Sequence, residues 1–232
     1  EGNIGAARII KMLDVKDDQL VVESKGIYSI ENFLVARRLM YWQVYLHKTS
    51  VAYENMLVSA LLRAKELAIK GVELFASPAL KFFLYNDINR ERFKSDPKCL
   101  ENFILLDDND IWTALKVWCN HNDIILATLS QGMVNREIFK VEVSPTPCTE
   151  ERLNAISERI AKQLHISKED TRYFISTPSI EKNMYNPADD SIDILYNDGS
   201  TTNIAEASDM LHLSVLSKKV KKYYICYLRE KK

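Results

Sequence analysis

The feature that most constrains the fold is a long segment, residues 26–70, which contains no proline and, after Gly26, no glycine. Because these two residue types are the usual helix breakers, the segment predicts one long helix. We expect it to be bent or divided near Thr49 and Ser50, where Thr49 could cap a second helix. At 100° per residue, six side chains fall on one narrow stripe of this helix: Ile30, Leu34, Arg37, Tyr41, Tyr45 and Lys48.

The opposite side of the same helix is also apolar, with Val35, Leu39, Trp42 and Leu46. A helix that is apolar on all sides is normally buried between other elements, so we expect it to be central to the fold. Its stripe would then carry an arginine, two tyrosines and a lysine inward or into a cleft. Since buried cations need anionic partners, the stripe indicates a phosphate or carboxylate ligand.

Composition places the chain among ordinary globular proteins. Its 232 residues are enough for one large domain or two small ones, and 47% of them are hydrophobic and 27% charged. A net charge of -1 argues against a nucleic-acid partner held by bulk electrostatic attraction. No apolar run is long enough to span a membrane. The four cysteines are widely spaced, as expected of reduced thiols in a cytoplasmic protein.

Patterns along the chain predict a mostly α-helical fold with a C-terminal α+β part. Residues 1–135 read as a helical lobe built around the long central helix, with one short strand at Gln19–Glu23. Residues 136–232 read as a small mixed lobe of about four strands. The strands are expected at 138–143, 172–177, 191–196 and 221–228, and a helix at 149–164.

Sequence motifs for catalysis are missing. There is no phosphate-binding glycine loop and no nucleophile elbow, and the four histidines are isolated from one another. Asp107, Asp108 and Asp110 could suggest a metal loop, but the glycine and downstream glutamate of a calcium loop are absent. We therefore interpret these aspartates as the start of a helix.

Spacing alone leaves the role of the stripe open. Tyr41 and Tyr45 could be core aromatics, and Arg37 and Lys48 could pair with local carboxylates. In the other interpretation the same four side chains contact an anionic ligand. Both interpretations are compatible with the helical spacing.

The run ENFLVARRLMYWQVYLHKT (residues 31–49) closely resembles the helix that follows the catalytic core in HD-domain phosphohydrolases of the deoxynucleoside-triphosphate triphosphohydrolase type. These include bacterial dGTPase-like enzymes and the vertebrate SAM-and-HD-domain dNTP hydrolase. The segments EGNIGAARIIKMLDV, DDNDIWTALKVW and MVNREIFKVEV are similar to other parts of the same enzymes. The resemblance covers most of the chain and is sharpest between Arg37 and Lys48.

This resemblance implies a hydrolase that cuts a dNTP into a deoxynucleoside and triphosphate. The implied cofactor is a divalent metal (Mg, Mn, Fe or Ni) held by a His/His-Asp/Asp site, which should lie upstream of Glu1. The chain departs from the family pattern there, so we expect it to bind no metal and to be inactive alone. It starts without a methionine, which also suggests a piece of a longer protein.

The resemblance also implies roles for particular residues. Arg37 matches a triphosphate-contacting arginine, Tyr41 a substrate-facing position, and Tyr45 a tyrosine against the deoxyribose. A planar guanidinium suits phosphate oxygens, and a ring packed near C2′ would clash with a 2′-hydroxyl. His47 and Lys48 match positions near a subunit interface where some relatives bind a regulatory nucleotide. 

Arg136 and Lys140 resemble a basic pair in the family's helical lobe, which we interpret as structural or interfacial.

The partners implied are therefore a dNTP or another phosphoester, and further copies in a homo-oligomer. Two alternatives stay open. The chain could be a non-catalytic oligomerisation and nucleotide-regulatory module, or the parent enzyme could hydrolyse a different phosphoester.

Overall fold

The computed structural model describes residues 4–182, 191–208 and 220–230, which divide into two compact units. Unit 1 comprises residues 1–47 and 179–222, and unit 2 comprises residues 48–178 and 223–232. This division differs from the predicted boundary near Asn135, because segments from both ends of the chain enter each unit. The predicted fold class, mostly α-helical with a small α+β part, is confirmed.

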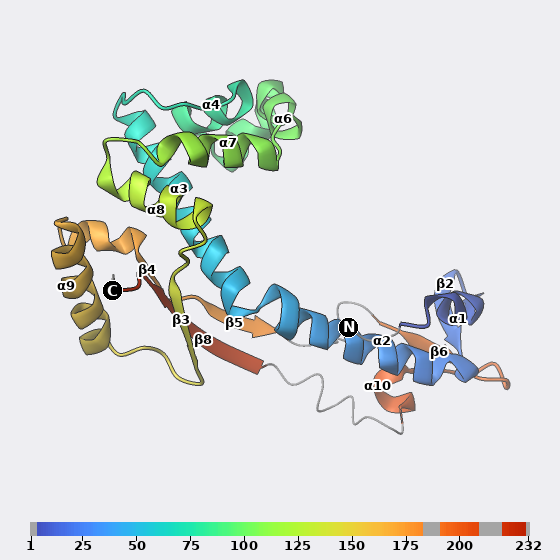
Figure 1. Ribbon diagram of the computed structural model, residues 1–232. Helices are drawn as coiled ribbons and strands as arrows, with labels where there is room; N and C mark the ends of the chain where they lie inside the picture. Colours follow the sequence, from blue (N-terminus) through green and yellow to red (C-terminus); the bar gives the residue numbers. More distant parts are fainter. Residues whose placement is uncertain (1–3, 183–190, 209–219, 231–232) are drawn as a thin grey trace. The chain divides into compact units, whose positions relative to one another are not determined.

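Unit 1 is built from a small sheet and the first part of the long helical segment (Figure 1). Its elements are α1 (Ala6–Lys11), β1 (Leu13–Lys16), β2 (Gln19–Glu23), a 3₁₀ turn (Ser24–Gly26), α2 (Ile27–Met40), the π-helical turn η2 (Tyr41–Tyr45), β5 (Ser179–Lys182), β6 (Asp193–Leu195), β7 (Thr201–Asn203), α10 (Ile204–Ala207) and the beginning of β8 (Val220–Tyr227). Three of these strands were predicted: β2 at Gln19–Glu23, β6 within 191–196, and β8 at 221–228.

The sheet of unit 1 has the strand order β1-β2-β6-β7. β1 and β2 form an antiparallel hairpin, and both residues of its loop, Asp17 and Asp18, have positive φ, as in a type I′ turn. β2 then pairs in parallel with β6, which is antiparallel to β7. The sheet therefore joins the beginning of the chain to a segment near its end.

Helix α2 packs on this sheet through Ile30 and Leu34, which form a core with Val22, Ile194 and Ile204. The chain turns from β2 into α2 at Gly26, which is buried. A Cβ there would lie 2.7 Å from Val22 Cγ1 and 3.0 Å from Met12 Cβ. Glycine is thus required by the close approach of helix and sheet.

We expect Gly26→Ala to destabilise unit 1 by about 1–3 kcal/mol, because the added methyl group overpacks this corner. Thermal unfolding followed by circular dichroism measures the effect. The double variant with Val22→Ala tests the cause, since it removes the atom that the new Cβ meets. It should lose less stability than the two single variants together, and simple additivity would contradict the explanation.

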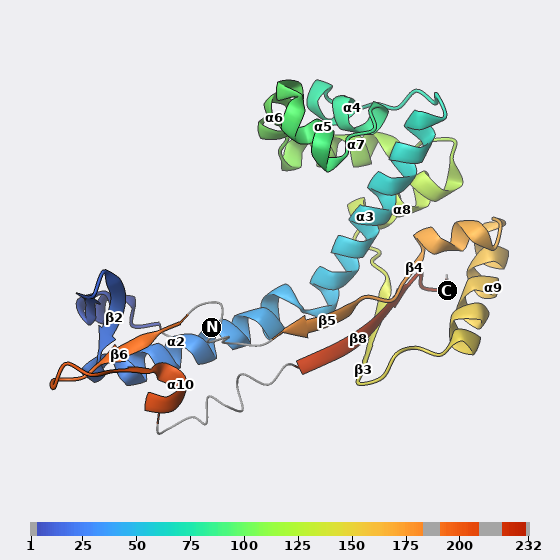
Figure 2. The same cartoon turned by 180° about the vertical axis from the view of Figure 1, so that it is seen from behind.

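Unit 2 is mainly helical. Its elements are α3 (Lys48–Ile69), α4 (Pro78–Tyr85), α5 (Arg90–Ser95), α6 (Pro97–Ile104), α7 (Asp108–Trp118), α8 (Ile124–Val134), β3 (Lys140–Ser144), α9 (Glu150–Leu164), the 3₁₀ helix η3 (Glu169–Tyr173), β4 (Ile175–Ser176) and the end of β8. The three strands pair antiparallel in the order β3-β8-β4, and α9 lies beside them in both views (Figures 1 and 2).

The core of unit 2 forms where α3 meets α8. Every fourth residue of α3 is buried and most are small, so the two helices approach closely; the row is Ala52, Met56, Ala60, Ala64 and Ala68. α7 packs on α8 from its other side, and the indole N–H of Trp118 donates to the carbonyl of Phe75 at 3.0 Å.

The long helical segment is confirmed, but its interruption lies elsewhere than predicted. α2 passes into η2, and the helix restarts at Lys48, so the break is at Leu46 and His47 and not at Thr49 and Ser50. The strand predicted at 172–177 is confirmed only in part, because residues 172 and 173 belong to η3 and the strand β4 covers only Ile175–Ser176. In the part of the chain that the structure describes, no helix is both long and apolar enough to cross a bilayer.

Candidate functional site

Three predicted site residues come together on the segment that follows the buried part of α2. The Arg37 guanidinium carbon lies 6.0 Å from the centre of the Tyr41 ring. The rings of Tyr41 and Tyr45 are 5.5 Å apart, tilted by 60°. Arginine, tyrosine and tyrosine thus form a continuous row within unit 1, which we call the Arg37–Tyr45 ladder.

The ladder is shaped by a change in helix type. Over Tyr41–Tyr45 the helix is π-helical, and the Leu46 N–H donates to the Tyr41 carbonyl at 2.8 Å, five residues back. The His47 N–H then bonds to the Val44 carbonyl at 3.3 Å. Single π turns occur frequently at functional sites. Here the π turn stands between the end of α2 and the break at Leu46 and His47. Sequence reasoning missed this turn, since no proline or glycine marks it.

The expectation that the stripe points inward is correct only at its start. Ile30 and Leu34 are buried, but Arg37 is exposed and Tyr45 is 57% exposed. The reason is that the sheet of unit 1 covers the first turns of α2 alone. The ladder is therefore accessible, and Arg37 is not a buried cation that needs an internal partner.

His47 and Lys48 lie directly after the ladder, and both are exposed. His47 ends unit 1, whereas Lys48 begins α3 and unit 2. Their predicted role at a subunit interface stays a prediction.

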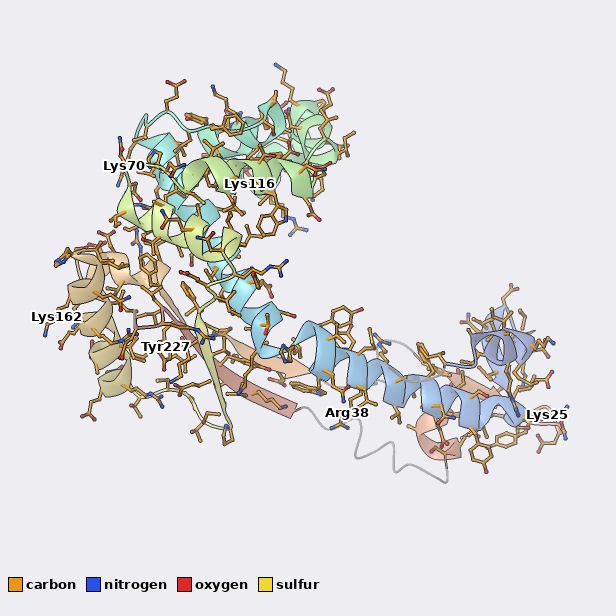
Figure 3. All side chains as sticks on the ribbon, viewed as in Figure 1. Lys25, Arg38, Lys70, Lys116, Lys162 and Tyr227 are labelled. Carbon is orange, nitrogen blue, oxygen red and sulfur yellow. The ribbon has the colours of Figure 1, made fainter. Side chains whose placement is uncertain are left out.

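Trp42, beside the ladder on the same helical segment, forms a second contact between an aromatic ring and a cation, which the sequence did not predict. The Lys222 ammonium lies 4.0 Å from the centre of the Trp42 ring, a cation–π contact between β8 and η2. Arg38, one turn before Trp42, projects from the same helix (Figure 3). Because Lys222 is far from Trp42 in sequence, spacing offered no signal for this contact.

Among the described parts of the chain, no three His, Cys, Asp or Glu side chains lie close enough to hold a metal ion. As predicted, Asp107, Asp108 and Asp110 begin a helix, and Asp107 is the N-cap of α7. The structure adds a capping box between Asp107 and Asp110. The pKa of Asp107 is lowered by hydrogen bonds from the Asn109 side chain and from backbone N–H groups.

Arg136 and Lys140 lie in different surroundings. The Lys140 ammonium lies 3.3 Å from the Glu142 carboxylate and close to the Tyr227 ring. Its pKa is raised, mainly by the hydrogen bond with Tyr227 and to a smaller extent by the one with Glu142. Tyr227 in turn donates to Glu142 at 2.6 Å and is marked in Figure 3. Lys140 is thus part of a charge cluster on the unit 2 sheet, whereas Arg136 lines a cavity.

The ladder can offer two kinds of contact to a ligand. At one end, the guanidinium of Arg37 can donate paired hydrogen bonds to phosphate or carboxylate oxygens. Toward the other end, the two tyrosines present ring faces and hydroxyl groups suited to a sugar or base. This is the arrangement expected for a molecule with an anionic end and a less polar body.

Comparison with known proteins adds a family relationship to this geometry. Residues 4–76 match the family described as HD associated region. A phosphohydrolase from Bacteroides thetaiotaomicron of known structure is 73% identical, with a TM-score of 0.94 over 98% of this chain and 57% of that chain. These findings support a relation to HD-domain-associated phosphohydrolases.

Two further relatives are more distant. The uncharacterized protein YwfO of Bacillus subtilis (strain 168) is 28% identical over 145 residues, which are 62% of this chain and 31% of YwfO. A hypothetical protein from Aquifex aeolicus shares the fold with a TM-score of 0.60, at 21% identity, over 98% of this chain and 49% of that one. The chain therefore spans only about a third to a little over half of the length of these relatives.

Proposed function

We propose, from the premise that the chain is related to HD-domain-associated phosphohydrolases, that it is the C-terminal portion of a metal-dependent enzyme of this kind. The proposed reaction is hydrolysis of a dNTP to the deoxynucleoside and triphosphate. In it, the Arg37–Tyr45 ladder supplies part of the substrate wall. The metal-binding half would lie outside this chain.

The observation that carries this proposal is the position of the ladder. It lies inside residues 4–76, the region that matches the HD associated family. It is accessible, and its two ends differ in chemistry in the way that the two ends of a nucleotide do. A triphosphate contacts Arg37 in this proposal, and a deoxyribose lies against Tyr45, with Tyr41 between them.

In this proposal the metal and the residues of this chain have different roles. When bound, a divalent metal polarises the α-phosphate and activates water. This chain's own residues bind and orient the substrate: Arg37 holds triphosphate oxygens, and the Tyr45 ring occupies the space beside C2′. Because a 2′-hydroxyl would meet that ring, ribonucleotides are disfavoured. His47 and Lys48 are proposed to act at a homo-oligomer interface that binds a regulatory nucleotide.

The test is a dNTP hydrolysis assay with Mg²⁺ or Mn²⁺, which compares this chain with a longer protein that includes the upstream region. We expect triphosphate release from the longer protein alone. Hydrolysis by the isolated chain would contradict the proposal, because it would require a metal site among the residues at hand. A panel of other phosphoesters in the same assay tests the alternative that the enzyme acts on a different substrate.

The second candidate is a non-catalytic oligomerisation and nucleotide-regulatory module. The exposure of Tyr45 favours it, because an exposed aromatic ring is available to a second copy of the chain or to a bound nucleotide. It predicts that the longer protein binds dNTP without cleaving it. Equilibrium binding of a labelled dNTP, measured beside the hydrolysis assay, separates the two functions.

Tyr45→Ala in the longer protein should relax discrimination between deoxyribose and ribose substrates by about tenfold or more, because the ring that excludes the 2′-hydroxyl is gone. The ratio of kcat/KM for a dNTP and its ribonucleotide measures this effect. Tyr45→Phe is the matched control, since it keeps the ring and should keep the discrimination. A ratio that stays constant in both variants would show that Tyr45 has no part in sugar selection.

A further inference from the structure

Unit 2 contains a cavity of about 650 Å³ that the proposed function does not use. Its walls come from α3, α8, α9 and the segments that follow α8 and β8, all within unit 2. This volume falls in the range of small-molecule sites in proteins. The residues that line it determine which kind of ligand it could bind.

The floor of the cavity is apolar and tightly built. Met56 and Phe139 are 1% and 2% exposed, and the Phe139 N–H points to the Met56 sulfur at 3.4 Å. Gly132 completes this floor, because a Cβ there would lie 2.8 Å from Met56 Cε and 3.2 Å from the Glu137 carbonyl oxygen. The deep part of the cavity is therefore apolar, and the apolar body of a ligand would lie toward it.

The rim is polar, and most of its groups already have partners. The side-chain amides of Gln131 and Gln163 donate to the carbonyls of Cys119 and Arg229, at 2.7 Å and 3.1 Å. Arg229 donates from Nε to the carbonyl of Ile138 at 2.9 Å, which fixes its guanidinium at the rim. 

Glu230 lies 3.6 Å from Arg159. The other charged residues of the rim are Glu137 and Arg136.

Arg136 differs from the rest of the rim in two respects. Its φ is +60°, in the left-handed region, where the chain leaves α8 and the Glu137 N–H bonds back to the Gly132 carbonyl at 2.8 Å. Glycine is the residue that normally ends a helix in this way, because a Cβ is strained there. Within residues 4–182, 191–208 and 220–230, Arg136 also forms no ion pair.

A strained backbone that carries an uncommitted guanidinium at the edge of a cavity indicates a function for that side chain. The charge balance of the rim narrows the ligand. Two arginines face two glutamates, so a polyphosphate would meet repulsion as well as attraction. A ligand with a single negative charge meets less repulsion from the two glutamates than a polyphosphate does.

We propose that this cavity binds a small monoanionic molecule with an apolar body, a carboxylate, whose charged group is held by Arg136 with Arg229 beside it. The planar fork of Arg136 matches the two carboxylate oxygens, and the apolar body rests on Met56 and Phe139. This proposal does not depend on the dNTP hydrolase function.

The test is calorimetric titration of the chain with 1-naphthoate, comparing the wild type with Arg136→Gly. We expect the wild type to bind the probe and Arg136→Gly to bind it at least tenfold more weakly, because the charge-assisted bonds are lost. The melting temperature of Arg136→Gly should be equal to or higher than that of the wild type, since glycine relieves the left-handed strain. Weaker binding therefore cannot be attributed to unfolding.

His165→Gly is the matched control. His165 has φ +54° at the end of α9 and does not line the cavity. It should gain stability in the same way and keep the wild-type affinity. 1-Naphthalenemethanol, which lacks the charge, should bind at least tenfold more weakly than 1-naphthoate, and inorganic triphosphate should not displace 1-naphthoate.

Three results would overturn the proposal. One is failure of 1-naphthoate to bind the wild type, and another is unchanged affinity in Arg136→Gly. The third is displacement of the probe by inorganic triphosphate, which would mean that the rim selects polyanions.

Discussion

Replacing Asp123 with alanine is expected to destabilise unit 2 by about 3–5 kcal/mol, the usual cost of breaking a buried ion pair on one side. Asp123 accepts two hydrogen bonds from Arg63, at 3.1 Å from Nε and 2.6 Å from the terminal nitrogen. The two side chains are only 15% and 13% exposed. This pair connects the middle of α3 to the beginning of α8.

Asp123 also caps a helix, so its removal lowers the stability of unit 2 in a second way. Its carboxylate caps α8 by accepting a hydrogen bond from the Leu126 N–H at 2.8 Å. Without it, Arg63 keeps longer contacts with Glu66 and Asp170, at 3.6 Å and 3.7 Å, and a place over the Tyr173 ring, 5.4 Å from its centre. A charge that stays largely buried with such partners is costly.

Urea unfolding of the variant and the wild type measures the effect. Asp107→Ala is the matched control, because Asp107 also caps a helix but is exposed and forms no ion pair among the described residues. Its loss should cost about 1 kcal/mol, as for an N-cap alone. If Asp123→Ala cost no more than Asp107→Ala, the ion pair would contribute nothing measurable.

The same pair predicts a dependence on pH. Burial acts to raise the pKa of Asp123, but hydrogen bonds from Arg63 and from the Leu126 N–H lower it more, so the pKa lies below its usual value of 3.8. The stability that this gives is present above pH 3.8 and is lost as the pH falls through the lower, folded-state pKa. The stability difference between the wild type and Asp123→Asn should therefore shrink in that acidic range.

Arg37→Ala in the longer protein is expected to weaken triphosphate binding by about 1.5–3 kcal/mol, the value of a charge-assisted hydrogen bond. The loss should appear as a fall in kcat/KM for dNTP hydrolysis of roughly 10- to 150-fold. Arg38→Ala is the matched control, because it removes the same charge from the neighbouring helix position. Unchanged kcat/KM in Arg37→Ala would remove Arg37 from the substrate wall.

Helix starts were the most predictable part of the fold, because they are decided locally. Asp107 and Thr149 were assigned as helix starts from their neighbours alone, and both accept backbone hydrogen bonds at those positions. A capping side chain needs only the next three residues to act. The long helical segment was predictable for the same reason.

Strands and unit boundaries were harder, because they depend on distant partners. β7 consists of three polar residues, Thr201–Asn203, and becomes a strand through pairing with β6. The boundary predicted near Asn135 assumed that neighbouring segments fold together, whereas unit 1 recruits residues 179–222. No local pattern marks such a recruitment.

The candidate site was predictable in part. Helical spacing correctly placed Arg37, Tyr41 and Tyr45 on one side of the helix, and their contacts agree with it. It could not predict how far the covering sheet extends, so the burial of Arg37 and Tyr45 was wrong. The cavity beside Arg136 is formed by segments from α3 to the end of β8, which no spacing rule connects.

The sheet of unit 1 also bears on how the protein is made. During synthesis, β2 leaves the ribosome long before β6, the parallel strand with which it pairs. Until β6 follows, the inner residues of β2, Val21 and Val22, lack their pairing strand, and an unpaired strand edge invites association with other chains. Nascent chains that stop before residue 193 should therefore be more dependent on chaperones than the finished protein.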